Sequence, residues 1–107
     1  MKYPRYKELD DICNEMQKLI TREMQETLER YCDLEVYYFF SHDIFSCEVD
    51  VNYYGVTIGA GHTIPAKDLR NATDDELREI CVDCADTLCT YVKESMKKVE
   101  GNEKDKG

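Results

Sequence analysis

The feature that most constrains the fold is a strict alternation of apolar and polar residues over residues 44–53. The apolar set is Phe45, Cys47, Val49, Val51 and Tyr53, and the polar set is Ser46, Glu48, Asp50 and Asn52. A period of two places the two sets on opposite faces of a β-strand. This segment therefore predicts a strand in the middle of a sheet, with one face buried and the other face open.

Sequence typical of strands also lies on either side of this segment. Residues 34–40 are rich in aromatic and β-branched side chains, and the polar residues 41–43 that follow suit a hairpin turn. Gly55 predicts a turn with a positive φ angle, after which residues 56–60 are expected to form a third strand. Short turns between consecutive strands predict an antiparallel meander.

Apolar residues recur at helical spacing at both ends of the chain. Residues 5–31 predict an amphipathic helix, and its apolar stripe contains Leu9, Ile12, Cys13, Met16, Leu19 and Ile20. A connection over residues 61–72 leads to Thr73 and Glu76, whose spacing is that of a capping box. The helix that begins there is predicted to end at about Lys98. Its apolar stripe contains Leu77, Cys81, Cys84, Ala85, Leu88, Val92, Met96 and Val99.

The predicted order of helix, three strands and helix defines a two-layer α+β fold (αβββα). Each helix has one apolar stripe and the central strand has one apolar face, so both helices are expected on the same face of the sheet. A chain of 107 residues has room for one core. Residues 1–100 are therefore predicted to form a single domain, and the charged residues 101–107 a disordered tail.

The same order of elements occurs in the double-stranded-RNA-binding domain, a family that binds phosphates through lysines at the start of its last helix. At that position this chain has Thr73-Asp74-Asp75-Glu76, which carries the opposite charge. Direct binding of nucleic acid is therefore not predicted.

Among the six cysteines, Cys81 and Cys84 have the CxxC spacing that suggests a metal or redox site. A structural zinc site needs four converging ligands, and no second CxxC or HxxxH motif accompanies this pair. Because a free cysteine packs like a small apolar residue, the pair is interpreted as core, with a zinc or thiol role as the alternative. No metal or cofactor is expected. Reduced thiols, together with the lack of a signal sequence or a long apolar run, predict a cytoplasmic protein.

Acidic residues dominate the charge of the chain. The 23 Asp and Glu outnumber the 14 Lys and Arg, which gives a formal net charge of −9. Coulomb repulsion makes nucleic acids and anionic membranes poor partners, whereas a basic protein surface is complementary. The acids repeat along the second helix and stand beside aromatic residues on the open sheet face. The predicted partner-binding residues are Glu35, Tyr37, Phe39, Glu48, Asp50, Glu76, Glu79, Asp83 and Asp86.

These features predict a small protein-binding module, and the lack of a catalytic motif argues against an enzyme. The most specific hypothesis is an inhibitor that mimics nucleic acid and blocks the basic groove of a nucleic-acid-binding protein or nuclease. Phage anti-defence proteins such as anti-CRISPRs are similar in size, charge and lack of catalytic equipment. Three alternatives stay open: a homo-oligomeric structural or adaptor domain that associates through the open sheet face, a zinc or thiol protein that uses Cys81 and Cys84, and acidic surfaces that serve only solubility.

Overall fold

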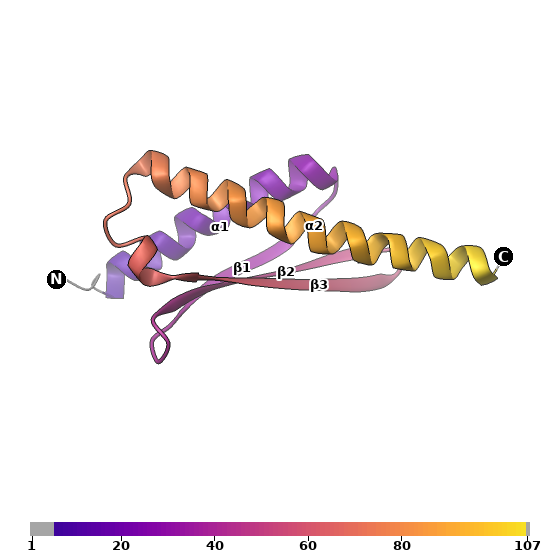
Figure 1. Cartoon of the computed structure of the whole chain (residues 1–107), viewed down its shortest axis with the longest axis horizontal. Helices are drawn as coiled ribbons and strands as arrows, with labels where there is room; N and C mark the ends of the chain where they lie inside the picture. The colour runs from indigo at the N-terminus through magenta and orange to yellow at the C-terminus, as the bar shows by residue number, and fades with distance from the viewer. Residues whose placement is uncertain (1–5, 107) are drawn as a thin grey trace.

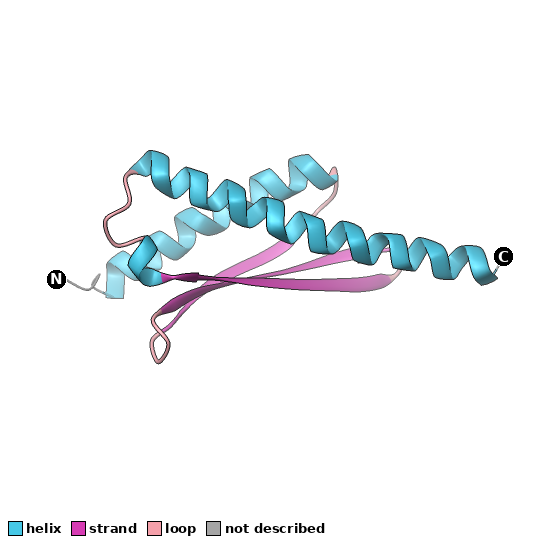
Figure 2. Ribbon diagram, viewed as in Figure 1, coloured by secondary structure: helices cyan, strands magenta, loops and turns pink. Residues whose placement is uncertain are grey.

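Two helices pack on one face of a three-stranded antiparallel sheet in the computed structural model, which describes the backbone of residues 6–106 and the side chains of residues 9–101 (Figure 1). The elements, coloured by type in Figure 2, are α1 (Tyr6–Leu28), β1 (Asp33–Phe39), β2 (Ile44–Tyr53), β3 (Val56–Pro65), the 3₁₀ turn η1 (Ala66–Asp68) and α2 (Asp74–Lys106). The strand order is β1-β2-β3. The predicted α+β fold is thus confirmed, with β2 at the centre. Residue 5, where the first helix was predicted to begin, lies outside the described residues.

Both hairpin turns use residues with positive φ. The turn between β2 and β3 has two residues, Tyr54 (φ 52°) and Gly55 (φ 77°), inside the closing pair of Tyr53 and Val56. Positive φ at both positions is the geometry of a type I′ hairpin, and it confirms the prediction for Gly55. The longer turn between β1 and β2 ends at Asp43, which also has a positive φ of 51°.

Strand β3 is longer than the sequence suggests. It continues to Pro65, so the prediction of irregular structure over residues 61–65 is wrong. The proline is tolerated because of its position in the ladder. The N–H of the next residue, Ala66, donates to the Asp43 carbonyl at 3.0 Å. Hydrogen-bonded and non-hydrogen-bonded pairs alternate in antiparallel sheets, so a residue at position 65 would direct its N–H away from β2 and the ladder loses no bond there.

The core lies between the sheet and the helix layer. The inner face of β2 is buried through Phe45, Cys47, Val49 and Val51. Helix α1, which packs on β1, contributes Met16, Ile20 and Met24, and helix α2, which packs on β3, contributes Cys81, Cys84, Leu88 and Val92. The alternation in β2 and the two helical stripes therefore identify the core correctly. Cys81 and Cys84 are both buried within it, as predicted.

The sequence predicts the start of α2 correctly but not its end. At its start the predicted capping box is confirmed, because the Glu76 N–H donates to Thr73 Oγ1 (3.2 Å) and the Thr73 N–H to Glu76 Oε1 (3.4 Å). At its other end the helix continues to Lys106, so the predicted end near Lys98 is wrong. The predicted disorder of residues 101–107 stays a prediction, since the side chains beyond Gly101 lie outside the described residues.

Beyond residue 98, α2 makes a contact with the sheet. The Tyr53 hydroxyl, at the end of β2, donates a hydrogen bond to the Glu100 carboxylate. That carboxylate raises the pKa of Tyr53 to about 12. Figure 1 shows α2 passing over the end of the sheet in this region. None of the helices within residues 6–106 has the length and apolar character needed to cross a membrane.

Candidate functional site

Four carboxylates stand together on the open face of the sheet. Asp33 and Glu35 belong to β1, Glu48 and Asp50 to β2, and all four are exposed. The strand register places Asp33 directly opposite Asp50, and Glu35 directly opposite Glu48. Opposed residues have Cβ atoms about 5 Å apart, and successive residues on one face of a strand are about 6.7 Å apart. The four residues therefore form a compact quadrilateral of negative charge, here called the acidic quartet.

No basic side chain of the sheet offsets the acidic quartet. The strands β1, β2 and β3 contain no Lys or Arg, and these four acids are the only Asp or Glu in them. Like charges directly opposite each other destabilise a sheet, by up to about 1 kcal/mol per pair. Stability alone does not favour such an arrangement, because Thr or an opposite charge at either position would be better.

An aromatic pair borders the acidic quartet on β1. The rings of Tyr37 and Phe39 meet edge to face with centroids 5.0 Å apart. The Tyr37 hydroxyl donates to the Glu48 carboxylate, which raises the pKa of Tyr37, and a hydrogen bond from Ser46 acts in the opposite direction. Ser46 lies opposite Tyr37 and is only 6% exposed, although it is on the open face. The aromatic pair therefore covers part of this face and holds one carboxylate of the quartet in place.

On the other side of β2, the quartet borders two glycines of β3. Gly59 lies opposite Asp50, and Gly61 lies opposite Glu48. A Cβ atom on Gly59 would be 3.4 Å from Oδ1 of Asp50, and one on Gly61 would be 3.9 Å from Cγ of Glu48. The Asp50 side chain therefore leans over β3 at Gly59, a position that has no side chain of its own, whereas the Glu48 carboxylate is held by Tyr37 of β1.

The structure divides the predicted partner-binding residues between two surfaces. Five of them share the open sheet face: Glu35, Tyr37, Phe39, Glu48 and Asp50. The other four are exposed on α2, in the helix layer on the opposite side of the sheet: Glu76, Glu79, Asp83 and Asp86. The Glu76 side chain also accepts the capping bond from Thr73, so part of its role is structural. The acids of α2 therefore lie on a different surface from the five residues of the sheet face.

Sequence reasoning missed one member of the acidic quartet. The sequence predicts a first strand that begins at residue 34 and so excludes Asp33, whereas β1 begins at Asp33. The available signal was its spacing, since Asp33 precedes Glu35 by two residues and so shares its face.

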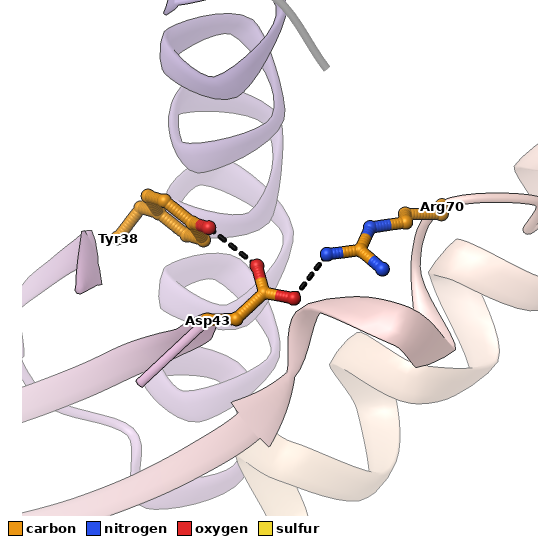
Figure 3. A network of polar contacts seen from close by, with 3 residues as sticks. All are labelled: Tyr38, Asp43 and Arg70. Atoms are coloured by element: carbon orange, nitrogen blue, oxygen red, sulfur yellow. Dashed lines mark hydrogen bonds and ion pairs between the residues drawn. The ribbon is translucent and has the colours of Figure 1, made fainter. Parts of the chain in front are cut away.

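A polar network fixes the hairpin at one end of the open face. Figure 3 shows that the Asp43 carboxylate accepts hydrogen bonds from the Tyr38 hydroxyl and from the Arg70 guanidinium. Those two contacts, that with Tyr38 first, hold the pKa of Asp43 below its ordinary value. The Arg70 side chain is only 10% exposed, so this cation is engaged with Asp43 and does not neutralise the acidic quartet. The network ties the β1–β2 turn to the connection before α2.

The chemistry of the site is that of a charged surface. Among the described residues, no group of three or more His, Cys, Asp or Glu side chains is arranged to hold a metal ion. All six cysteines are free thiols, and burial, together with the nearby Cys84, raises the pKa of Cys81 to about 12. Comparisons of the chain with protein-family models, with curated proteins and with solved structures gave no match. The function is therefore inferred from the geometry of this surface.

Proposed function

We propose that the protein is a small acidic binding module whose open sheet face docks on a basic surface of another protein. The observation that carries this proposal is the acidic quartet: two like-charge pairs side by side, in strands without a Lys or Arg. Such pairs cost stability, and a Lys- or Arg-rich partner would convert that cost into binding energy through charge-assisted hydrogen bonds. In this proposal the chain binds and does not catalyse.

The most specific form of the proposal is an inhibitor that mimics nucleic acid. Its carboxylates, about 5–7 Å apart, are within a factor of about two of the spacing of phosphates along one strand, about 3.4 Å of helix axis per charge. The sheet displays them at fixed positions, which suits a groove built to bind phosphates. The partner would be a nucleic-acid-binding protein or a nuclease, as for the phage anti-defence proteins that block such targets. The six free thiols fit a reducing compartment such as the cytoplasm.

Two matched variants separate the sheet face from net charge. The sheet variant carries Asp33→Asn, Glu35→Gln, Glu48→Gln and Asp50→Asn. The helix variant carries Glu76→Gln, Glu79→Gln, Asp83→Asn and Asp86→Asn, and Gln at position 76 can still serve the capping box. Each variant removes four negative charges, so a difference between them reports on position and not on total charge.

The test is capture of proteins from a bacterial lysate on the immobilised chain at about 50 mM salt, followed by elution with rising salt. We expect the wild type and the helix variant to retain the same basic proteins, and the sheet variant to lose them. We also expect double-stranded DNA to displace the captured proteins, because a nucleic-acid mimic and DNA compete for one groove. Equal retention by both variants, or elution that does not respond to salt, would contradict the proposal.

Self-association through the same face is the alternative function. A face-to-face dimer would place two acidic quartets against each other, and Coulomb repulsion opposes that contact. We therefore expect a monomer at micromolar concentration in sedimentation velocity. A dimer that is lost on changing Tyr37 to Ser would favour the alternative.

A further inference from the structure

The outer edge of β3 presents backbone groups without a neighbouring strand. Among the described residues, β3 pairs only with β2. Tyr53 and Val56 close the two-residue hairpin, and hydrogen-bonded pairs alternate with non-hydrogen-bonded pairs from there along the ladder. The bond from Ala66 to Asp43 confirms that the even-numbered residues of β3 face β2. The odd-numbered residues 57, 59, 61 and 63 therefore direct their N–H and C=O groups outward, and all four are exposed.

The opposite edge of the sheet is protected. On β1, the outward N–H of Val36 donates to Oε1 of Gln17 from helix α1 at 3.3 Å. The same strand carries Asp33 and Glu35, and charged residues on an edge discourage pairing with another chain. Strand β3 has ten residues and no Asp, Glu, Lys or Arg, and its proline stands at the last position. The β3 edge therefore lacks both the side-chain hydrogen bond and the charged residues that protect the β1 edge.

Gly59 of β3 connects this edge to the acidic quartet. The Asp50 carboxylate lies over Gly59 and so extends from β2 toward the edge, whereas the Glu48 carboxylate accepts the hydrogen bond from Tyr37 of β1. A strand added beside β3 would lie about 4.8 Å from it. A Lys or Arg side chain from such a strand spans that distance, and no side chain at position 59 or 61 stands in its way.

We propose that the outer edge of β3 binds an extended basic segment of a partner protein as a fourth, antiparallel strand, with a Lys or Arg side chain that crosses Gly59 to reach Asp50. This inference rests on the proposed function and specifies the partner. In an antiparallel pair, residues directly opposite each other share a face. A basic residue would thus stand opposite Gly59, and the residues at every second position from it would share the acidic face.

Charge selects a basic partner over a second copy of this chain. Pairing β3 with β3 of another copy around a two-fold axis would extend the sheet with both acidic faces on the same side. Each copy carries a formal net charge of −9, and the Asp50 side chain leans toward the shared edge. A basic strand instead forms backbone hydrogen bonds and ion pairs together, which is the usual mode of strand addition with side-chain specificity.

The test uses three fluorescent eight-residue peptides in which Lys and Thr alternate. One is unmodified, the second is N-methylated at every Lys, and the third is N-methylated at every Thr. In the proposed antiparallel pairing the Lys N–H groups point to β3 and the Thr N–H groups point away. The two methylated peptides have the same charge and the same composition. We expect the dissociation constant to rise about tenfold or more for the Lys-methylated peptide and to change little for the Thr-methylated one. We also expect slower hydrogen exchange of the Gly59 and Gly61 amides when the unmodified peptide is bound.

The outcomes distinguish this inference from the proposed function. If both methylated peptides bind as well as the unmodified one, and the double variant Glu48→Gln/Asp50→Asn weakens all three, the edge proposal fails while the acidic face remains a binding surface. If no peptide binds, the edge proposal also fails, and capture by the sheet and helix variants decides the proposed function separately. Loss of binding on Lys methylation, with the Gly59 and Gly61 amides protected, supports the strand addition.

Discussion

Val49 and Asp50 are neighbours in β2, yet they lie on faces of the sheet that affect folding stability in opposite ways. Val49 is 1% exposed beneath the two helices, whereas Asp50 is exposed on the open face, directly opposite Asp33. On the covered face every side chain of β2 contributes to a packed core. On the open face two like-charge pairs oppose folding. The comparison indicates that stability explains the covered face, whereas the open face carries the charges on which the proposed binding function rests.

The largest expected effect is a difference in stability between two variants that place Asn on opposite faces of β2. Val49→Asn removes a buried apolar side chain and leaves an amide without hydrogen-bond partners, so we expect a loss of about 3–5 kcal/mol in the free energy of unfolding. Asp50→Asn introduces the same residue on the open face and relieves repulsion from Asp33. We expect it to change stability by no more than about 0.5 kcal/mol, or to stabilise the protein. Urea denaturation measures both, and similar losses for the two variants would contradict the division into two faces.

A smaller effect is expected at Asp43, an acid that has partners, in contrast to the acidic quartet. Asp43→Asn weakens the bonds to Tyr38 and Arg70, so we expect a lower melting temperature than that of the wild type at pH 7. The pKa of Asp43 is lowered by folding, so its stabilisation is fully present above the ordinary value of 3.8 and is lost as pH falls through the lowered pKa. The melting temperatures of the two proteins should therefore converge in acid. A difference that stays constant down to pH 2 would show that the charge of Asp43 is not the cause.

The smallest effect should be a gain in stability on the open face. Glu35→Thr removes the repulsion with Glu48 and places a β-branched residue in a strand, so we expect stabilisation by about 0.5 kcal/mol. Salt screens exposed charges, so the gain should shrink at about 1 M salt. The matched control is Glu79→Gln on α2, where no opposite acid of the sheet is relieved. A loss of stability for Glu35→Thr would indicate that the acidic quartet has a structural role.

Sequence periodicity predicts most of this fold because it reports which side of each element is buried. The alternation over residues 44–53 and the stripes of the two helices identify the two layers and the core. Periodicity fails where the extent of a strand depends on its pairing with a neighbouring strand. Pro65 is compatible with β3 only because its nitrogen points outward, and that direction follows from the ladder with β2.

The candidate site shows the same limit. Its acids can be read from the sequence, but the opposition of Asp33 to Asp50 depends on the register of the hairpin. The contact of Asp50 with the Gly59 position depends in turn on the next hairpin. Arg70 and Asp43 are 27 residues apart, and no local pattern relates them. Sequence reasoning therefore joined the acids of α2 and of the sheet into one site, and only the three-dimensional arrangement separates them.

The most direct test of the central claim is the affinity of a labelled octalysine peptide for the wild type, the sheet variant and the helix variant as salt is raised from about 50 mM. If the acidic quartet is the recognition surface, the wild type and the helix variant should bind equally, with affinity that falls steeply as salt rises. The sheet variant should bind at least about ten times more weakly at the lowest salt. Equal weakening in the two variants would show that total charge, and not the arrangement on the open face, determines binding.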